Sequence, residues 1–235
     1  MVGMWHLGDL DLIESLTPEE QGELQRSSCV QKFDAGETVF RPSGEPKSVY
    51  LLVDGAIRIY RLSDKGSEAT FGYVQPGEVF GELAALIEVG RESYAEATTP
   101  SVVWCIPIDL FRRLLGWRSG VGIEVSRQLA ERLKRIERRV EGLMFHDARR
   151  RLAVVLRELA DHFGVHRGGG VEIDGDFTQA ELATIVGCSR QTLNQCLREL
   201  EGLGLAEMKR RRVRLSDLDA LREFIEHGPP ANRGG

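Results

Sequence analysis

Glycines recur about every ten residues through the first half of this 235-residue chain, and that spacing restricts what this half can fold into. They stand at Gly36, Gly44, Gly55, Gly66 and Gly77, and the runs between them are short and rich in β-branched and aromatic residues. Because glycine accepts the positive φ of tight turns, evenly spaced short strands are typical of an all-β roll or barrel. The pattern predicts a β-roll over residues 30–106, preceded by a short helix that Thr17 caps and Pro18 opens.

The pattern becomes helical after Pro107. Between residues 121 and 145, apolar side chains follow one another at steps of four, three, four and three: Leu129, Leu133, Ile136, Val140 and Leu143. This is the heptad spacing of a helix that packs against a copy of itself, so we predict a symmetric homodimer with these five residues at its interface. An amphipathic helix lying on its own domain is the alternative, because only about two heptads are present.

Two helix starts lie within residues 177–205. Thr178, followed three residues later by Glu181, has the composition of a capping box, and Gly187 ends the helix that this box opens. Ser189 then caps a second helix. The inward face of the second helix is made of leucines at steps of four and three: Leu193, Leu197 and Leu200. Two short helices joined by a glycine turn predict a helix-turn-helix.

The outward face of this second helix is polar, and a recognition helix places its N-terminal residues against base edges in the major groove. We predict that Arg190 reads guanine and that Gln191 and Gln195 set the preference at neighbouring bases. Two β-rich runs flank residues 209–212, a basic hairpin tip suited to phosphates, so the domain is predicted to be winged. The predicted DNA-binding residues are Thr178, Gln179, Ser189, Arg190, Gln191, Thr192, Asn194, Gln195, Lys209, Arg210 and Arg211.

These elements predict an α+β chain in four parts. A β-roll effector domain covers residues 1–120, a dimerisation helix and hinge residues 121–146, a winged helix-turn-helix residues 147–228, and a disordered tail residues 229–235. Ser216 is predicted to cap the last helix, over residues 217–227. Residues 1–120 carry a net charge of −7 and residues 121–235 a net charge of +2, so only the second half tolerates nucleic acid.

This order of roll, dimer helix and winged helix resembles the cyclic-AMP receptor protein family, also called the CRP/FNR transcription regulators, over residues 10–227. Residues 185–192, Ile-Val-Gly-Cys-Ser-Arg-Gln-Thr, are similar to the family's DNA-reading helix, and residues 76–83, Pro-Gly-Glu-Val-Phe-Gly-Glu-Leu, resemble its phosphate-binding cassette. The resemblance implies a DNA-binding regulator that contacts RNA polymerase. It also implies an effector site at Gly81, Glu82, Leu83, Arg91, Ile136 and Glu137.

The residues at the predicted effector site bear on which ligand it would take. In relatives that bind cyclic AMP, the counterpart of Glu82 holds the ribose, and a downstream arginine, here Arg91, precedes a hydroxyl residue and grips the phosphate. Here Glu92 follows Arg91, and a carboxylate repels a phosphate. Ile136 and Glu137 replace the threonine and serine that read adenine, and cannot donate the same hydrogen bonds. Cyclic AMP is therefore disfavoured, while another cyclic nucleotide, a different small effector or no effector stays open.

The residues do not favour an iron–sulfur centre, haem or an enzymatic activity. The four cysteines, Cys29, Cys105, Cys188 and Cys196, form no cluster that would hold an iron–sulfur centre. Residues 143–147 resemble the hinge of haem-binding relatives, but residues 80–82 offer no Cys or His ligand, which disfavours haem. A redox pair of Cys29 and Cys105 requires that the roll bring them close, and buried strand thiols are the commoner case. No histidine lies between Leu7 and Phe145, and no catalytic motif is found, so we expect no enzyme.

The chain has no apolar run of about 18 residues and no signal-peptide pattern in residues 1–10, so we expect a cytoplasmic protein without a membrane partner. The predicted function is a homodimeric, sequence-specific regulator of transcription that binds a pseudo-palindromic site in double-stranded DNA. The alternative is a nucleotide-binding regulatory module that acts on a protein partner. That alternative keeps the roll and the dimer helix but leaves the winged helix unexplained.

Overall fold

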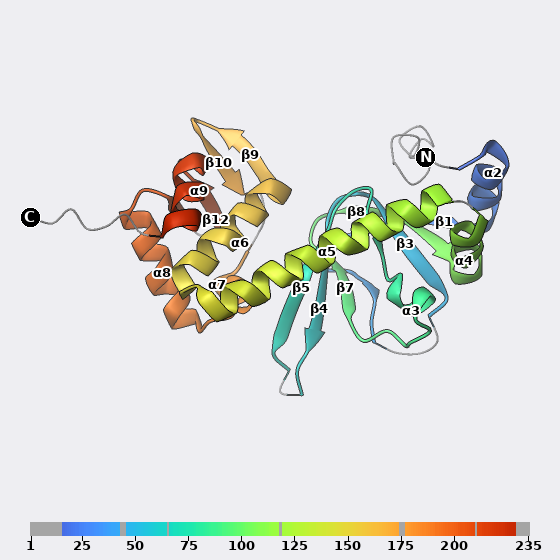
Figure 1. The fold of residues 1–235 in the computed structure, drawn as a ribbon, viewed down its shortest axis with the longest axis horizontal. Coiled ribbons are helices and arrows are strands. Elements are labelled where there is room, and N and C mark those ends of the chain that lie inside the picture. The colour runs from blue at the N-terminus through green and yellow to red at the C-terminus, as the bar shows by residue number, and fades with distance from the viewer. Residues whose placement is uncertain are drawn as a thin grey trace, which may run out of the picture. The chain divides into compact units, whose positions relative to one another are not determined.

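The computed structural model of the chain describes residues 16–42, 46–64, 66–117, 119–173, 177–209 and 211–228. The chain divides into two compact units, Met1–Lys134 and Arg135–Gly235, which are described separately below. The division falls within helix α5 (Ser119–Phe145), the long helix near the middle of Figure 1. The predicted tail at residues 229–235 lies outside the described residues.

The first unit contains the predicted β-roll. Two antiparallel four-stranded sheets form it, with strand orders β1-β8-β3-β6 and β2-β7-β4-β5. Before α5, its elements are α2 (Pro18–Ser27), β1 (Cys29–Phe33), β2 (Thr38–Phe40), β3 (Ser48–Asp54), β4 (Ile57–Leu62), β5 (Glu68–Val74), β6 (Val79–Phe80), α3 (Leu83–Leu86), β7 (Tyr94–Ala97), β8 (Ser101–Pro107) and α4 (Ile108–Trp117). The capping box expected at the start of α2 is present at Thr17.

Turn glycines allow the strands to reverse direction. Gly55, between β3 and β4, has φ +92, and a β-carbon there would lie 2.3 Å from Oγ of Ser101. Both the backbone angle and the close approach exclude a larger residue. Gly36, Gly66 and Gly77 also adopt positive φ, as their spacing predicts, and Gly44 lies outside the described residues.

Alternate residues of β3 and β8 belong to two different apolar cores, as the two-residue period of a strand requires. Leu52, Val103 and Cys105 belong to one core, together with residues of β4, β6 and β7. Val49, Leu51, Trp104 and Ile106 belong to the other, together with apolar residues of α2, α4 and the start of α5. The sheet that contains β3 is therefore packed on both faces, which holds the side chains of its inner face in place.

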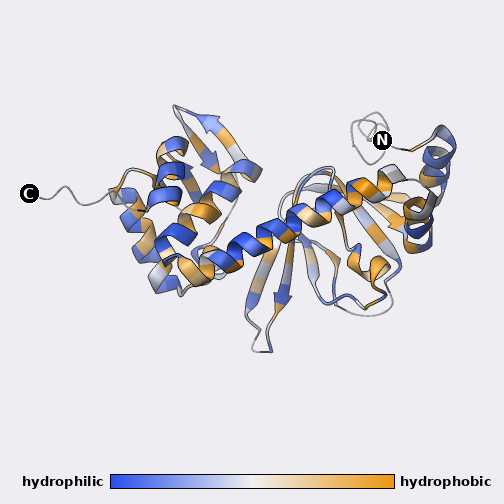
Figure 2. Cartoon of the chain, viewed as in Figure 1, coloured by the Kyte–Doolittle hydropathy of each residue, from blue (hydrophilic) through white to orange (hydrophobic). Residues whose placement is uncertain are grey.

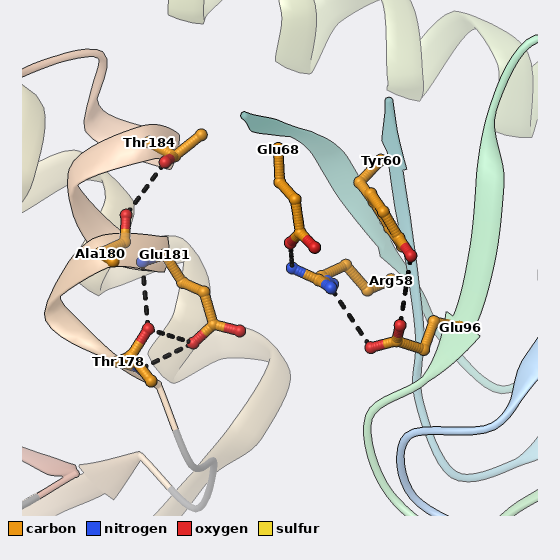
Figure 3. A network of polar contacts seen from close by, with 8 residues as sticks. All are labelled: Arg58, Tyr60, Glu68, Glu96, Thr178, Ala180, Glu181 and Thr184. Carbon is orange, nitrogen blue, oxygen red and sulfur yellow. Dashed lines mark hydrogen bonds and ion pairs between the residues drawn. The ribbon is translucent and has the colours of Figure 1, made fainter. Parts of the chain in front are cut away.

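A buried arginine joins three strands of the second sheet (Figure 3). Arg58 of β4 is 5% exposed and forms ion pairs with Glu68 of β5 at 2.8 Å and Glu96 of β7 at 3.2 Å. Its guanidinium carbon lies 4.3 Å from the centre of the Tyr60 ring, and the Tyr60 hydroxyl donates to Glu96 at 3.3 Å. The charge of Arg58 is therefore compensated where it is buried, as a buried cation requires.

Tyr60 makes the stability of the first unit sensitive to alkaline pH. Burial, with the nearby carboxylates of Glu96 and Glu68, raises the pKa of Tyr60 from 10.0 to about 12. The folded state holds this proton more tightly than the unfolded state, so its contribution to stability is complete below about pH 10 and is lost as the pH rises toward about 12. We expect urea unfolding, followed by tryptophan fluorescence, to show a smaller alkaline loss of stability in Tyr60→Phe than in the original chain. All three tryptophans, at positions 5, 104 and 117, lie in the first unit, and equal losses in the two proteins would contradict this expectation.

The second unit contains the predicted winged helix. After the end of α5, its elements are α6 (Ala148–Phe163), β9 (Gly164–Arg167), β10 (Gly170–Ile173), α7 (Gln179–Val186), α8 (Arg190–Gly202), β11 (Ala206–Lys209), β12 (Arg212–Leu215) and α9 (Leu218–His227). Its four strands form one antiparallel sheet in the order β11-β12-β10-β9. Strands β9 and β10 were not anticipated, because their glycines indicate only the end of a helix.

Two local predictions in this unit need correction. Ser216 does not cap the last helix. Asp217 has the extended backbone of an N-cap, and its carboxylate accepts the amides of Asp219 and Ala220, so α9 begins one residue later than expected. The basic hairpin tip is also shorter, because Lys209 and Arg212 are paired across β11 and β12.

The predicted heptad residues of α5 differ in their environment. Leu129 packs against the core of the first unit. The other four are exposed in the single chain: Leu133 by 57%, Ile136 by 47%, Val140 by 50% and Leu143 by 56%. Figure 2 shows hydrophobic and hydrophilic segments interleaved along α5. Such an apolar stripe favours a partner helix over solvent. Within the described residues, no helix is both long and apolar enough to cross a bilayer.

Candidate nucleic-acid interface and effector site

The start of α7 is fixed by a capping box (Figure 3). The Thr178 hydroxyl accepts the Glu181 amide at 3.2 Å, and the Glu181 carboxylate accepts the Thr178 amide at 2.7 Å. The helix ends at Gly187, which has φ +71 and whose added β-carbon would lie 2.9 Å from Cδ2 of Leu143. Thr178, Glu181 and Gly187 thus occupy the positions predicted for them, and they set the length of α7 and the turn before α8.

Removing this cap is expected to loosen α7. Thr178→Ala loses the hydroxyl that accepts the Glu181 amide, and a lost N-cap costs about 1 kcal/mol, within a range of roughly 0.5–2. Native-state hydrogen exchange of the α7 amides measures this cost directly. Thr178→Ser keeps the hydroxyl and is the matched control, so equal protection in Thr178→Ala and Thr178→Ser would contradict the expectation.

The N-terminal turns of α8 present polar side chains to solvent. The Ser189 hydroxyl caps the helix by accepting the Thr192 amide at 3.0 Å. Arg190 donates from Nε to Oε1 of Gln179 at 3.4 Å, so the first residues of α7 and α8 lie side by side. Among the predicted DNA-binding residues, the exposed ones are Ser189, Arg190, Gln191, Gln195, Lys209 and Arg211, and the half-buried ones are Thr178, Gln179, Thr192 and Asn194. Arg210 lies outside the described residues.

Cations of the wing hairpin β11–β12 have acidic neighbours. Lys209 is 2.6 Å from Glu207, and Arg212 is 2.9 Å from Glu172 of β10. Exposed ion pairs of this kind contribute little, about 0–1 kcal/mol, so they oppose a new phosphate contact only weakly. Val213 and Leu215 of β12 are buried, which anchors the hairpin while its charged side chains stay in solvent.

Three consecutive arginines at the start of α6 join the helices of the second unit. Arg149 pairs with Glu199 of α8 at 3.2 Å, and Arg150 donates to backbone carbonyls in the last turn of α9. Arg151 donates to the His146 carbonyl at 2.8 Å, to the last carbonyl of α7 at 2.9 Å and to that of the turn glycine at 3.2 Å. The segment that follows α5 is therefore hydrogen-bonded to the turn before the recognition helix.

These arginines were not predicted from the sequence. The available signal is their position in the first turn of α6, starting two residues after its N-cap, Asp147. Although burial opposes it, hydrogen bonds from the Arg150 amide and the Arg149 side chain hold the pKa of Asp147 below its usual range. Asp147 therefore remains an ionised cap, and it orients Arg149 as well as the helix.

In the first unit, Arg91 lies where the resemblance places a phosphate-binding arginine. Its guanidinium carbon is 3.9 Å from the centre of the Phe40 ring and 5.1 Å from that of Tyr50, and it donates to the Ser48 carbonyl. A β-carbon at Gly81 would lie 2.4 Å from Nη1 of Arg91, and Gly81 has φ +73. Glycine at position 81 therefore admits the guanidinium, and burial lowers the pKa of Arg91.

Glu82 is held by α5 within the same unit. Its side chain is buried and pairs with Arg132 at 2.7 Å, and Arg132 also donates to the Val79 carbonyl. Gln128 accepts the Val79 amide at 2.9 Å and donates to the Gly77 carbonyl at 3.0 Å. Gln128 and Arg132 were not predicted in this role. Gln128, Arg132 and Ile136 follow one another at steps of four residues, which places all three on one side of a helix and is the signal that could have found them.

Glu92, which follows the predicted phosphate-binding arginine, has a cation beside it. The Glu92 carboxylate forms an ion pair with Arg61 of β4, and Arg61 also donates to Ser93 at 3.3 Å. Glu92 is therefore compensated, and its repulsion of a bound phosphate is weaker than expected for a free carboxylate. Leu83 is 54% exposed beside Glu82. Ile136 and Glu137 are exposed residues of the second unit, and their part in an effector site stays a prediction.

Comparison with known proteins agrees with both halves of this description. Residues 30–116 match the family model of the cyclic nucleotide-binding domain, and residues 150–224 match that of the Crp-like helix-turn-helix domain. No group of three or more metal-ligating side chains is found in the described part of the chain.

Individual relatives resemble most of the chain. A CRP-like cAMP-activated global transcriptional regulator of Mycobacterium tuberculosis is 30% identical over 211 residues, which cover 89% of this chain and 94% of the relative. The global nitrogen regulator of Synechococcus elongatus is 29% identical over 196 residues, covering 82% and 87%. The crystal structure of a CRP/FNR-family transcriptional regulator from Thermus thermophilus has a TM-score of 0.74 and 27% identity, covering 86% of this chain and 100% of the other.

Proposed function

Since the chain belongs to the CRP/FNR family of DNA-binding transcription regulators, which are not enzymes, we propose that it binds a pseudo-palindromic DNA site as a homodimer, with one α8 in each half-site. The observation that supports this most directly is the exposed polar face of α8, where Arg190, Gln191 and Gln195 point away from the core. Arginine suits the two acceptors of guanine, and glutamine suits the donor and acceptor of adenine. Ser189, Thr178 and Gln179, at the helix starts, would position the phosphates.

The proposed dimer rests on α5. Four apolar residues at heptad spacing are about half exposed in the single chain, and a second copy of the helix would cover them. A two-fold axis along α5 would relate the two recognition helices as the two half-sites of a palindrome are related. RNA polymerase is the further proposed partner, and the cytoplasm, where a bacterial promoter is transcribed, is the proposed location.

For the effector, we propose either a small anionic ligand other than cyclic AMP or a chain that binds DNA without one. Arg91 offers a cation inside the roll for a phosphate or carboxylate. The similar proteins do not indicate which ligand this chain binds. One is described as cAMP-activated, and another, at nearly the same sequence identity, as a nitrogen regulator. Ile136 and Glu137 provide no hydroxyl donor for adenine, which still disfavours cyclic AMP.

Selection from random duplex DNA tests the proposed function. We expect the original chain to enrich an inverted repeat whose half-site centres are about 10 base pairs apart, and its affinity to fall linearly on a logarithmic salt scale. The alternative, a regulatory module for a protein partner, lacks salt-dependent retention on duplex DNA. Failure to enrich any sequence at low salt would overturn the proposal.

The selected duplex then tests the effector. We expect cyclic AMP at saturating concentration to leave DNA affinity unchanged, because the adenine-reading hydroxyl groups are missing. Cyclic GMP and cyclic dinucleotides are tested alongside, and Arg91→Gln shows whether any response depends on the guanidinium. An increase in affinity with cyclic AMP that Arg91→Gln abolishes would contradict the expectation.

A further inference from the structure

Two cysteines of the β-roll face each other across neighbouring strands. Cys29 of β1 and Cys105 of β8 are direct partners in the antiparallel pairing. Directly opposed residues of antiparallel strands have Cα atoms about 4.5 or 5.5 Å apart and side chains on the same face. Disulfides span Cα separations of about 4.4–6.8 Å, so residues opposed in this way lie within the range that a disulfide can bridge.

Solvent reaches one of the two thiols. Strand β1 is at the edge of its sheet, and Cys29 is exposed. Cys105 is 6% exposed and belongs to the apolar core that residues of both sheets of the β-roll form. Burial, together with the Cys29 thiol, raises the pKa of Cys105 to about 12. An oxidant in solution therefore meets Cys29 first, with Cys105 in place behind it as the resolving thiol.

We propose that Cys29 and Cys105 are a reversible dithiol–disulfide pair that hydrogen peroxide oxidises. The Cys29 sulfur attacks one peroxide oxygen, the O–O bond breaks, and a sulfenic acid and one water are formed. The Cys105 sulfur then attacks the Cys29 sulfur, the S–O bond breaks, and the oxygen leaves as a second water with the Cys105 proton. Two thiols and one peroxide thus give one disulfide and two waters, and a dithiol reductant reverses the change.

The pair lies at one end of a row of side chains that leads to Arg91. In successive strands, Cys105 is paired with Tyr50, and Tyr50 with Phe80, so all lie on the inner face of one sheet. The Tyr50 and Phe80 rings stack at 5.3 Å, and the Arg91 guanidinium lies 5.1 Å from the Tyr50 ring. An S–S bond of about 2.05 Å draws the Cys105 sulfur toward Cys29 and changes the packing beside Tyr50. The oxidation state of the pair is therefore expected to affect the environment of Arg91.

Peptide mass mapping of the full chain tests the chemistry. After hydrogen peroxide treatment and alkylation under denaturing conditions, we expect a disulfide-linked peptide that contains Cys29 and Cys105 and disappears with dithiothreitol. Cys29→Ser should abolish this peptide. Cys188→Ser, a change in the second unit, should leave it unaffected and is the matched control.

Two outcomes of the mapping would overturn the proposal. One is oxidation of Cys29 to sulfinic acid while Cys105 remains open to alkylation. The other is a disulfide that joins Cys29 to Cys188, to Cys196 or to another chain. Cys105→Ala adds an independent measurement, because it should convert the reversible oxidation of Cys29 into an irreversible one.

The effect on Arg91 has its own readout. In nitrogen-15 spectra of the original chain, the side-chain Nε–H signal of Arg91 is expected to shift on peroxide treatment and to return on reduction. The same treatment of Cys29→Ser should leave that signal in place. If the Arg91 signal does not move although mass mapping shows the disulfide, the proposed coupling between the thiol pair and Arg91 is wrong.

Discussion

Val140→Glu is expected to convert the proposed dimer into single subunits and to lower the affinity for a full palindromic site by about 100-fold or more. Val140 is 50% exposed in the single chain, so the subunit loses little packing from the substitution. In a two-fold related pair of α5 helices, Val140 would lie close to its own copy. Two carboxylates would then be brought side by side at an apolar interface, which is unfavourable.

DNA affinity falls because the two recognition helices are no longer joined in one particle. When two recognition helices belong to one particle, the second half-site is bound at a high effective concentration, and separated subunits lose this advantage. Light scattering measures the mass of the particle, and fluorescence anisotropy measures binding to full-site and half-site duplexes. We expect the affinity for a half-site to be nearly unchanged, which would show that α8 and the wing remain folded.

Lys134→Gln is the matched control for this experiment. It changes the net charge by the same amount and lies on α5, but at an exposed position outside the heptad residues. It should stay dimeric and keep its affinity apart from a small salt-dependent change. A Val140→Glu protein that remains a dimer would show that α5 is not the interface, and the proposed arrangement on DNA would then be wrong.

Arg190→Ala is expected to remove the preference for guanine at one position in each half-site. A bidentate arginine–guanine pair discriminates by about 1–3 kcal/mol, so the loss at two half-sites amounts to roughly 2–6 kcal/mol for the preferred sequence. Binding to other sequences should change much less, so the protein becomes less selective rather than inactive. Repeating the selection from random duplex DNA measures this directly.

Two further variants separate base recognition from charge. Arg190→Lys keeps the cation but lacks the planar fork, so it should keep most of the non-specific affinity and lose the guanine preference. Arg198→Ala removes an exposed arginine from the same helix, two turns further along, and should weaken binding without changing the selected sequence. If Arg190→Ala selects the same site as the original chain, Arg190 does not read the bases.

Patterns within a few residues predicted the elements that carry the proposed function. Thr178 and Ser189 were identified as N-caps because each hydroxyl accepts an amide three residues away, so the interaction is present in the local sequence. Gly187 was identified as a helix end because glycine accepts the positive φ of a helix C-cap, which is also a local property. The one-residue error at α9 arose because Ser216 and Asp217 are both good N-caps, and sequence alone does not show which has the extended backbone.

Contacts between distant residues were not predictable in this way. The pairing of Glu82 with Arg132 spans 50 residues, and that of Glu92 with Arg61 spans 31. The ion pair between Glu92 and Arg61 weakens one argument against a bound phosphate. The sequence had suggested that the Glu92 carboxylate is a free charge, whereas Arg61 compensates it. The hydrogen bonds of Arg151 to the turn before α8 were missed because that turn lies about 35 residues away.

The sequence by itself determined the order of roll, long helix and winged helix-turn-helix, the family and the residues that α8 exposes, because strand period, helix period and capping depend on neighbours along the chain. Only the tertiary structure decided which charges are compensated, which α5 residues hold the cassette and that Cys29 faces Cys105. These depend on strand pairing and on packing between segments far apart in sequence. A composition pattern does not encode the register that brings two such residues together, since one residue of slip would turn Cys29 to the opposite face of the sheet.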